Sequence, residues 1–552
     1  MFVRVKVQSL WWVVSLLSVA SLAAAGGDFR LAEAVKKGDK AAVRSLLQEG
    51  ADVNEPLGDG ATALAWAAHR DDLETAEMLI RAGADATAAN DYGVTPLSLA
   101  CTNRNSAMVE KLLEAGADPN AAQGSGETVL MTCARAGNLE AVKLLLARDG
   151  VDVDAKETNR GQTALMWAVA AKHPEVARVL IEHGADVNAR SRVLELFAAK
   201  RVDFYGDDVH YATSKGGFSP LMFAARMGDV ESARILLAAG ANVNYATPEY
   251  GSVLVVASAS AQEEVALLLL EKGAEPNGTG PTGLTALHWA VREGLRVLSG
   301  NVGRGDTNRF WDRPNMPGLV KALLAYGANP NARIRKEFHP YNTPFHTRNM
   351  GNSLPQIVIV GATPFLLAAA SGDLENMRLL VEGGADPRLA AEDGATALMV
   401  AAGVGSERSR TYRVADNSYR TEANRKRTNA LEAAKLALQL GVDINAVEGG
   451  GRSVLHGASY LRDHEMIKFL VENGANLEAK DKYGGTPLSI ALGDPEGLYY
   501  RNRGGGRYDD RFRVITGEDK ETAELLLKLG AAPFTGKRRL RGSEEITASQ
   551  SQ

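Results

Sequence analysis

Hydrophobic residues recur along this chain in pairs of short runs with helical spacing, and a polar, turn-rich stretch follows each pair. In residues 91–123, Leu97 and Ala100 lie three apart on one face of a first predicted helix. Met108 and Leu112 lie four apart on one face of a second. Because residues three or four apart share a helix face, this pattern predicts a helix–turn–helix unit with one buried side.

The ends of these two predicted helices carry their own signals. Thr95 stands where a hydroxyl can cap the first helix, and Pro96 occupies the first helical position, where a missing N–H costs nothing. Gly116 follows the second helix and favours a left-handed C-cap. Two helices this short cannot bury their apolar side alone, so we expect neighbouring units to stack into a continuous core.

The pattern repeats at a nearly constant period, which predicts a repeat array. Twelve helix-like runs end in Gly followed by Ala or Val, mostly about 33 residues apart, at Gly50, Gly83, Gly116, Gly150, Gly184, Gly240, Gly273, Gly327, Gly384, Gly441, Gly474 and Gly530. Five intervals are longer by 21–24 residues, which is too short for another unit. Each longer interval therefore predicts an insertion.

These units resemble the ankyrin repeat, whose motif joins a T-P-L-H-type first helix to a Leu-rich second helix and then G-A-D-x-N. Matching first-helix segments are TALAWAA (62–68), TPLSLAC (95–101), TALMWAV (163–169), TALHWAV (285–291), TPFLLAA (363–369), TALMVAA (396–402) and TPLSIAL (486–492). The resemblance implies an all-α solenoid of about twelve helix–turn–helix repeats with hairpin-like connections and five 21–24-residue insertions. It would fill residues 26–536, with an N-terminal cap at 28–56, a C-terminal capping repeat at 483–536 and a disordered basic and polar tail at 537–552.

The five insertions are expected at about 193–215, 296–316, 334–360, 404–428 and 494–518. They hold 15 of the 33 aromatic residues and 22 of the 62 Lys and Arg. Tyr, Trp and Arg dominate the energetics of protein interfaces, so we predict partner-binding residues here. The candidates are Arg309, Phe310, Trp311, Arg313, Tyr412, Arg413, Tyr419, Arg420, Tyr499, Tyr500, Arg501, Tyr508 and Phe512. The alternative is that these aromatics only anchor each insertion to the array.

Three tryptophans share one register, four residues after the capping Thr, at Trp66, Trp167 and Trp289. At 100° per residue this position faces away from the central apolar stripe. By the ankyrin resemblance, that side of the first helix looks into a concave groove. The tryptophans are therefore either a binding platform or a filling between neighbouring repeats.

Residues 1–25 have the layout of a secretory signal peptide. Arg4 and Lys6 precede an apolar run from Leu10, which ends at Ala23-Ala24-Ala25 before Gly26. The run of sixteen residues is shorter than the roughly 20 of a spanning helix. We expect cleavage after Ala25 and export to a periplasmic or secreted location in a bacterial-type envelope, without stable membrane insertion.

Composition and charge narrow the classes of function. Loss of Arg4 and Lys6 with the leader would lower the formal charge from −5 to about −7. A basic nucleic-acid-binding surface over the whole chain is therefore not expected. The two cysteines, Cys101 and Cys133, fall in the first helices of adjacent repeats. Stacked helices lie about 8–10 Å apart, so we predict buried free thiols and no disulfide.

Catalytic and metal motifs are missing or explained by the repeat. The chain has no G-x-S-x-G, S-x-x-K, G-x-x-x-x-G-K or C-x-x-C. His464-Glu465 begins like a zinc-protease motif, but Lys468 replaces the second ligand. His288 and His456 occupy the T-x-L-H position, which the ankyrin resemblance assigns to structural hydrogen bonding, while His339 and His346 lie in an insertion. We expect no cofactor, no metal and no enzyme.

The sequence as a whole predicts a non-catalytic scaffold that binds protein partners outside the cytoplasm, through the concave surface and the insertions. One alternative is a binder of envelope glycan or another non-protein ligand that stacks on exposed Trp and Tyr. A second is an enzyme whose site is built from the insertions.

Overall fold

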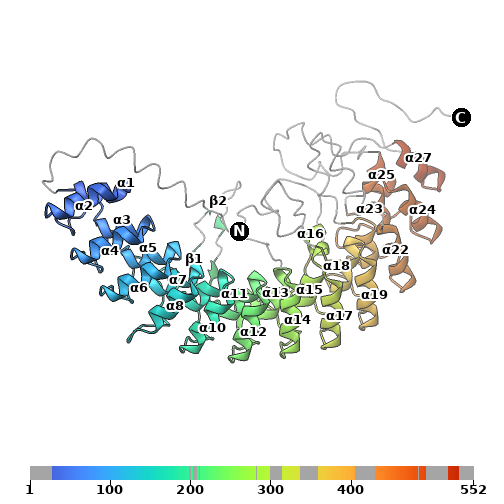
Figure 1. The fold of residues 1–552 in the computed structure, drawn as a ribbon. Helices are drawn as coiled ribbons and strands as arrows, with labels where there is room; N and C mark the ends of the chain where they lie inside the picture. Colours follow the sequence, from blue (N-terminus) through green and yellow to red (C-terminus); the bar gives the residue numbers. More distant parts are fainter. Residues whose placement is uncertain are drawn as a thin grey trace, which may run out of the picture. The chain divides into compact units, whose positions relative to one another are not determined.

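Figure 1 shows the computed structural model of the chain, which describes residues 28–197, 201–202, 208–209, 212–280, 282–298, 314–335, 359–404, 429–482, 484–492 and 520–533. Within these residues lie 25 α-helices and six short β-strands. The chain forms two compact units. Unit 1 comprises Met1–Ala198 with Tyr211–Tyr245, and unit 2 comprises Ala199–His210 with Ala246–Gln552.

Unit 1 contains six of the predicted helix pairs. They are α1 (Arg30–Lys37) with α2 (Lys40–Gln48), α3 (Ala63–His69) with α4 (Leu73–Arg81), α5 (Pro96–Asn103) with α6 (Ser106–Glu114), α7 (Val129–Ala136) with α8 (Leu139–Leu146), α9 (Ala164–Ala170) with α10 (Pro174–Glu182), and α11 (Pro220–Met227) with α12 (Val230–Ala238). First helices pack on first helices and second helices on second helices, so the pairs stack in chain order (Figure 1).

Unit 2 contains six more pairs. They are α13 (Val253–Ala259) with α14 (Glu263–Glu271), α15 (Ala286–Ala290) with α17 (Pro317–Ala325), α18 (Pro364–Ser371) with α19 (Leu374–Glu382), α20 (Ala397–Ala401) with α22 (Ala430–Gln439), α23 (Val454–Leu461) with α24 (His464–Glu472), and α25 (Pro487–Ala491) with α27 (Lys520–Lys528). An additional helix, α16 (Arg292–Leu298), follows α15 and packs on α18. The predicted all-α array of twelve repeats is confirmed.

The caps predicted from the sequence form as expected. The Thr95 hydroxyl accepts a hydrogen bond from the Ser98 amide, and the Ser98 hydroxyl accepts one from the Thr95 amide, which closes a capping box. Seven of the second helices begin instead at a carboxylate or amide cap, as where Asp72 accepts from the Thr75 amide. All twelve glycines that set the period adopt positive φ, between 77° at Gly150 and 106° at Gly530. They end the second helices as left-handed caps because no side chain hinders that conformation.

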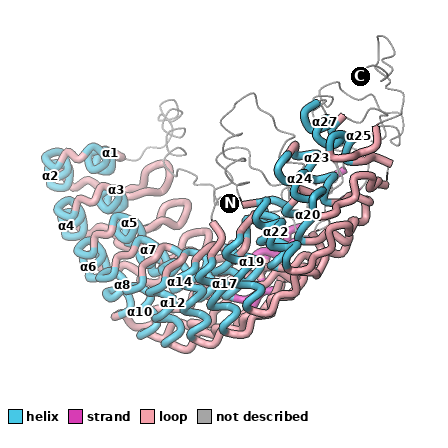
Figure 2. The backbone as a smooth tube through the Cα atoms, turned by 90° about the vertical axis from the view of Figure 1, so that its right-hand side faces the viewer, coloured by secondary structure: helices cyan, strands magenta, loops and turns pink. Residues whose placement is uncertain are grey.

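Asparagine side chains join the connections of successive repeats. The Asn120 side-chain Nδ2 donates to the Gly150 carbonyl oxygen over 2.8 Å, and its Oδ1 accepts from the Asp152 amide over 3.1 Å. Asn54, Asn188, Asn277, Asn331 and Asn445 make the same pair of bonds to the next repeat. This is the Asn of the G-A-D-x-N motif, and its bonds fix the spacing of the connections that Figure 2 shows along one side of the helices.

Short strands occur in two of the connections. In the predicted insertion 193–215, β1 (Leu194–Phe197) pairs antiparallel with β4 (Ala212–Lys215), and β2 (Arg201–Val202) pairs with β3 (Asp208–Val209). A smaller pair joins β5 (Ala246–Thr247) to β6 (Gly251–Ser252) just before α13. The other insertions fall in long intervals between helices, at the places that the sequence predicts.

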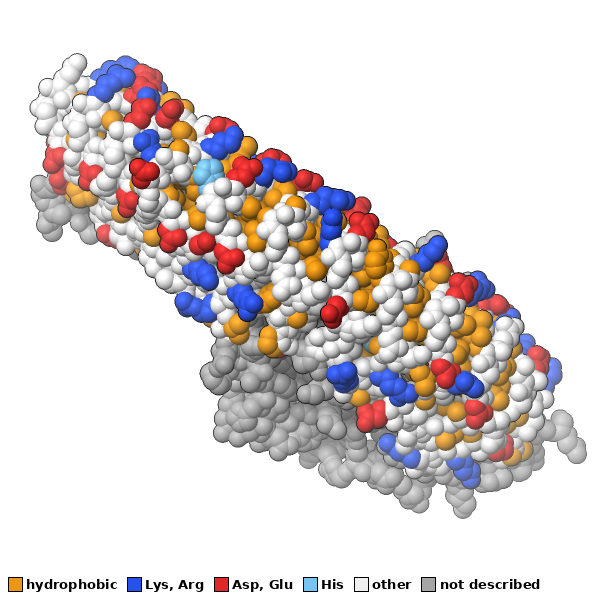
Figure 3. Space-filling view, turned by 90° about the horizontal axis from the view of Figure 1, so that it is seen from below, with side chains coloured by type: hydrophobic (Ala, Val, Ile, Leu, Met, Phe, Trp, Pro, Cys, Tyr) orange, Lys and Arg blue, Asp and Glu red, His pale blue; other side chains and the backbone are white. Residues whose placement is uncertain are grey.

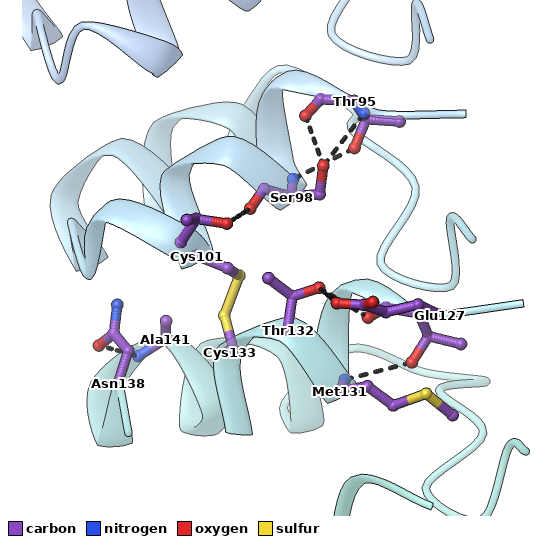
Figure 4. Close-up of a disulfide and its surroundings, with 11 residues drawn as sticks. Thr95, Ser98, Cys101, Glu127, Met131, Thr132, Cys133, Asn138 and Ala141 are labelled. Carbon is purple, nitrogen blue, oxygen red and sulfur yellow. Dashed lines mark hydrogen bonds between the residues drawn. A yellow bond between two sulfur atoms is a disulfide. The ribbon is translucent and has the colours of Figure 1, made fainter. Parts of the chain in front are cut away.

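The prediction of free cysteines is wrong. Cys101 in α5 and Cys133 in α7 form a disulfide, with their Cα atoms 4.6 Å apart (Figure 4). The prediction equated the distance between helix axes with the distance between Cα atoms. Each Cα lies about 2.3 Å from its axis, so facing Cα atoms approach about 4–5 Å closer than the axes. The neighbouring Ala100 and Ala134 are fully buried and leave room for this approach.

The face built by the second helices carries interspersed acidic and basic groups with hydrophobic side chains between them (Figure 3). Among the described residues, no helix is long and apolar enough to cross a membrane.

Candidate functional site

The three tryptophans of the shared register lie on the first helices α3, α9 and α15. Each is half-buried, whereas the leucines two positions earlier, Leu64 and Leu165, are fully buried. The predicted orientation away from the core stripe is therefore what the structure shows. These side chains form part of the first-helix side of the stack.

A cation from the preceding repeat covers the ring of two of these tryptophans. The Lys36 Nζ of α1 lies 4.8 Å from the ring centroid of Trp66. The Arg135 guanidinium carbon of α7 lies 4.6 Å from the ring centroid of Trp167. Both distances are within the range of a cation–π interaction. The sequence analysis did not single out these cations, although each is the seventh residue of its helix.

Acidic and aromatic neighbours hold both cations in place. Glu33 lies 3.8 Å from the Lys36 ammonium, and Glu127 accepts from the Arg135 guanidinium over 2.9 Å. The side chains of Lys36 and Arg135 are 45% and 52% exposed, whereas that of Glu127 is only 12% exposed. In the second pair, the guanidinium is therefore the group that faces outward.

The covered rings bear on both interpretations of Trp66 and Trp167, which stay predictions. Their indole Nε1 atoms are buried and make no hydrogen bond to protein. A platform for stacking needs a free ring face, and one face of each ring already carries a cation. In both places the tryptophan supports a cation of the preceding repeat.

A third aromatic–basic group lies in repeat six. Phe223 of α11 stands in the tryptophan register, four residues after the capping Ser219, and its ring meets that of Phe218 edge-on at 5.5 Å. The Arg226 guanidinium lies 5.8 Å from the Phe218 ring. A search for any aromatic residue four positions after the capping residue would find Phe223, whereas a search for tryptophan alone does not.

The thirteen candidate residues in the insertions lie outside the described residues. Their points of attachment, however, are described. The insertions near 404–428 and 494–518 leave after the first helices α20 and α25, and the one near 296–316 leaves after the additional helix α16, which runs to Leu298. They return at the second helices α22, α27 and α17. This confirms the prediction that they fall between the two helices of repeats eight, ten and twelve.

Hydrogen bonds close the base of the insertion in repeat eight. The Asn315 Oδ1 accepts from the Glu293 amide over 2.9 Å, and its Nδ2 donates to Asp373, the cap of α19, over 2.6 Å. The Met316 amide donates to the Ala290 carbonyl oxygen over 2.9 Å. The chain thus returns to the array beside the start of α16, the helix after which it leaves.

The insertion at 334–360 has an equally closed base on the side of the connections. The Ile334 amide donates to the Ala362 carbonyl oxygen, and the Gly361 amide donates to the Ile334 carbonyl oxygen, over 3.2 and 2.7 Å. Ile334 and Ile359 are buried. The insertion therefore extends an otherwise ordinary connection.

The histidines of the T-x-L-H position are structural, as the resemblance implied. The His288 Nδ1 accepts from the Thr285 amide over 3.2 Å, and its Nε2 faces the Ala362 carbonyl oxygen at 3.4 Å. Complete burial lowers the pKa of His288 to about 4. His456 makes the corresponding contacts with Ser453 and Gly485, and burial lowers its pKa as well.

No metal-binding group emerges in the part of the chain that the structure describes, where no cluster of three or more His, Cys, Asp or Glu has suitable geometry. His464 starts α24, and its Nε2 lies 2.9 Å from the Thr522 hydroxyl. His339 and His346 lie outside the described residues.

Stacked pairs of short antiparallel helices, glycine caps and Asn-bonded connections define a helix–turn–helix repeat protein. A model of three ankyrin repeats matches residues 31–123, 121–191, 194–280 and 423–499, and a model of a single ankyrin repeat matches residues 360–391. The chain belongs to the ankyrin-repeat family.

Curated relatives share the repeats over part of their own length. The chain is 23% identical over 381 residues to human transient receptor potential cation channel subfamily A member 1, covering 66% of this chain and 28% of that protein. It is 26% identical over 306 residues to the Arabidopsis thaliana E3 ubiquitin-protein ligase KEG, covering 49% of this chain and 17% of that protein. It is 29% identical over 233 residues to Danio rerio ankyrin repeat and SAM domain-containing protein 6, covering 41% of this chain and 29% of that protein. The chain thus spans less than a third of each relative.

Proposed function

We propose that this protein is a non-catalytic scaffold that binds protein partners outside the cytoplasm, through the first-helix side of its repeats and through its insertions. The observation that carries the proposal is the closed base of the insertions. Asn315 and Ile334 return the chain to an intact stack, so the insertions near 296–316 and 334–360 add surface without replacing any repeat.

The bonds between repeats favour binding by a preformed surface. The side chains of Asn120 and its counterparts fix each connection to the next, and Arg70 and Asn103 bond to carbonyl oxygens at the end of the preceding first helix. A surface that is ordered before binding loses little conformational entropy when a partner arrives. Membership in the ankyrin-repeat family supports protein partners for the same surface.

The disulfide supports the proposed location. Disulfides persist in oxidising compartments and are rare in the cytosol, where thiols are kept reduced. Cys101 and Cys133 are both fully buried, so their bond belongs to the packed interior of repeats three and four. An exported protein with the leader-like residues 1–25 would form this bond.

The non-catalytic part of the proposal rests on the absence of a recognised nucleophile–base pair in the sequence. One relative is named as an E3 ubiquitin-protein ligase, but the match covers 17% of that protein. The glycan-binding alternative would have to use the insertion aromatics, because cations cover Trp66 and Trp167.

The test is an exchange of insertions. We would replace residues 405–428 and 494–518 with short Gly-Ser links, keeping Val404 because it is fully buried. A matched control replaces residues 336–358, which leave from a connection on the other side of the helices. Helical circular dichroism and the melting temperature should stay close to those of the full chain in both variants, because neither replacement removes a helix that the structure describes.

Affinity capture from the native envelope would then compare the three proteins. We expect the first variant to lose most captured proteins and the control to retain them. Equal capture by all three would contradict a role for these two insertions and leave the first-helix side as the binding surface. Specific turnover of a captured molecule would contradict the non-catalytic proposal.

A further inference from the structure

The first-helix side of unit 1 is basic, although the chain as a whole is acidic. Its six first helices and the residues that end them hold eight basic residues and two acidic ones. The basic residues are Arg30, Lys36, Lys37, Arg70, Arg104, Arg135, Lys172 and Arg226, and the acidic ones are Glu33 and Asp71. The formal charge of the chain is −5. The basic excess is therefore local.

The second helices of the same unit do not share this excess. With the residue that ends each helix, they hold seven basic residues (Lys40, Arg44, Arg81, Lys111, Lys143, Arg178, Arg234) and nine acidic ones (Glu49, Glu74, Glu77, Glu110, Glu114, Glu140, Glu175, Glu182, Glu231). Many form ion pairs on that side, such as Lys111 with Glu114 and Lys143 with Glu140, each at 2.8 Å. Figure 3 shows the two signs interspersed on this face. The charge asymmetry thus separates the two sides of unit 1.

The first helices of unit 2 do not share the excess either. No Lys or Arg occurs in α13, α15, α18, α20, α23 or α25, and the residues that end these helices add one basic residue, Arg462 after α23. Arg292 of α16 is fully buried, and its guanidinium donates to the carbonyl oxygens of Ser258 and Ala259. Among the described first helices, outward-facing basic groups are concentrated in unit 1.

We propose that the first-helix side of unit 1 binds an acidic segment of a partner protein, with Lys36 and Arg135 as its two fixed anchors. This inference rests on the proposed scaffold function and names the chemistry of one partner. Charge complementarity carries it, because a carboxylate-rich segment meets basic groups on this side and mixed charges on the other.

The anchors are already held in position before any partner arrives. Trp66 and Glu33 hold the Lys36 ammonium, and Trp167 and Glu127 hold the Arg135 guanidinium. A long basic side chain normally loses rotamer freedom when it pairs, and support by a ring reduces that loss. The charged groups of Lys36 and Arg135 are thus about half exposed, and their positions are fixed by neighbouring side chains.

The spacing of the anchors sets the length of the segment. They belong to repeats one and four, and packed helices lie about 8–10 Å apart, so the anchors are separated by roughly 30 Å. About ten residues of extended chain span that distance. Between the anchors the tryptophan register holds Leu99, which is half-buried and offers an apolar contact. An acidic segment with interspersed apolar residues fits this order of groups.

A nucleic acid fits the surface less well. Its phosphates repeat every few ångströms, and proteins that bind it usually have a basic net charge and a dense row of cations. Here the anchors are three repeats apart, and the chain is acidic overall. A protein segment can carry carboxylates at the spacing of Lys36 and Arg135 without charges at every position between them.

The test uses the full chain and a fluorescent twelve-residue peptide that alternates Asp or Glu with Leu. The comparison peptide carries Asn and Gln in place of Asp and Glu. The site variant is K36Q/R135Q, and the matched control is K111Q/K143Q, which removes the same charge from exposed, ion-paired lysines of α6 and α8. Fluorescence anisotropy at low and high salt measures affinity, and circular dichroism checks that each variant folds.

We expect the acidic peptide to bind and the amide peptide not to bind. The affinity should fall about tenfold in K36Q/R135Q, since two exposed charge pairs with the peptide are lost. It should change little in K111Q/K143Q, recover in K36R/R135K and weaken with salt. Absence of binding, equal binding of the amide peptide, or equal losses in the site and control variants would overturn the proposal.

Competition and capture experiments distinguish an acidic protein segment from other anionic ligands and from the scaffold function. Stronger competition by single-stranded nucleic acid or by anionic vesicles than by unlabelled peptide would overturn a protein segment as the occupant. Loss of peptide binding in K36Q/R135Q should leave capture through the insertions intact. If the peptide fails to bind while the insertions still capture partners, only the acidic-segment inference fails. If the full chain captures no protein at all, the scaffold function itself fails.

Discussion

At the scale of single residues, position in the repeat decides what a side chain does. His288 illustrates this, because a residue that titrates near neutral pH in water is buried as a neutral hydrogen-bonding group. Its Nδ1 accepts from the Thr285 amide, and its Nε2 faces the Ala362 carbonyl oxygen beside the base of an insertion. It therefore links the capping of a first helix to the neighbouring connection.

His288 should make the stability of the fold depend on pH. Its pKa is lowered from 6.5 to about 4 by burial, so between these values the unfolded chain binds a proton that the folded chain does not. The contribution is fully present above pH 6.5 and is lost as the pH falls toward 4, by about 3 kcal/mol over the window. Urea unfolding at pH 7 and pH 5 would measure about 2 kcal/mol of this loss, because part of the window lies below pH 5. In H288Q the pH-dependent part should be smaller, whereas in the exposed control H69Q it should match the parent. An unchanged slope in H288Q would contradict the assignment.

At the scale of elements, the bonds between connections should hold neighbouring repeats in register. N120A removes the bonds to the Gly150 carbonyl oxygen and the Asp152 amide, and should destabilise the fold by about 1–2 kcal/mol. Hydrogen exchange at the Asp152 amide should accelerate.

A matched variant of the same residue is N120D. Asp154, the corresponding residue of the next repeat, accepts from the Asp186 amide at 3.0 Å with a carboxylate. N120D keeps this acceptor and loses only the donor, so its destabilisation should be smaller than that of N120A. Similar losses in both variants would show that the acceptor bond contributes little.

The disulfide between α5 and α7 should stabilise the array by restricting the unfolded chain. The cysteines are 32 residues apart, and a closed loop of that size corresponds to about 3–4 kcal/mol in the chain-entropy estimate. Denaturant unfolding should show a loss of this order in C101A/C133A. Unfolding the parent protein with reductant should give the same midpoint, to within the effect of the lost sulfur atoms. A parent protein that is insensitive to reductant would mean that the bond does not form.

The elements themselves could be predicted from the sequence, whereas contacts between repeats could not. Thr95, Pro96 and Gly116 act within a few residues of their own position, so helix bounds follow from local chemistry. The disulfide and the stacking of Lys36 on Trp66 join residues about thirty positions apart. Those contacts depend on how closely two helices approach and on which registers face each other. The insertion candidates depend on segments outside the described residues, so their roles stay predictions.

At the scale of the whole molecule, the two units differ in what they offer a partner. Unit 1 has a basic first-helix side with two supported cations, and unit 2 has nearly uncharged first helices with four of the five insertions attached to it. On the proposed function, a partner with both an acidic segment and an aromatic-binding surface could engage both units.

Export should define the start of the working protein. Cleavage after Ala25 would leave Gly26 as the first residue, three positions before the helix-preceding Phe29 of α1. N-terminal sequencing of protein from the envelope should therefore begin at Gly26, and thiol titration of the denatured, unreduced protein should find no free cysteine. A membrane-bound form that keeps residues 1–25, or two titratable thiols, would contradict export into an oxidising compartment.

The closed bases of the insertions allow the surface of the protein to change in evolution without a change in its fold. Ile334 forms backbone hydrogen bonds with Gly361 and Ala362, so the two ends of the insertion are held next to each other. Its length and composition can change while every bond that aligns the neighbouring repeats persists. In related proteins, the sequence between these two ends should therefore diverge faster than the sequence of the repeats. A foreign recognition loop grafted between the same ends should need no compensating change in the repeats.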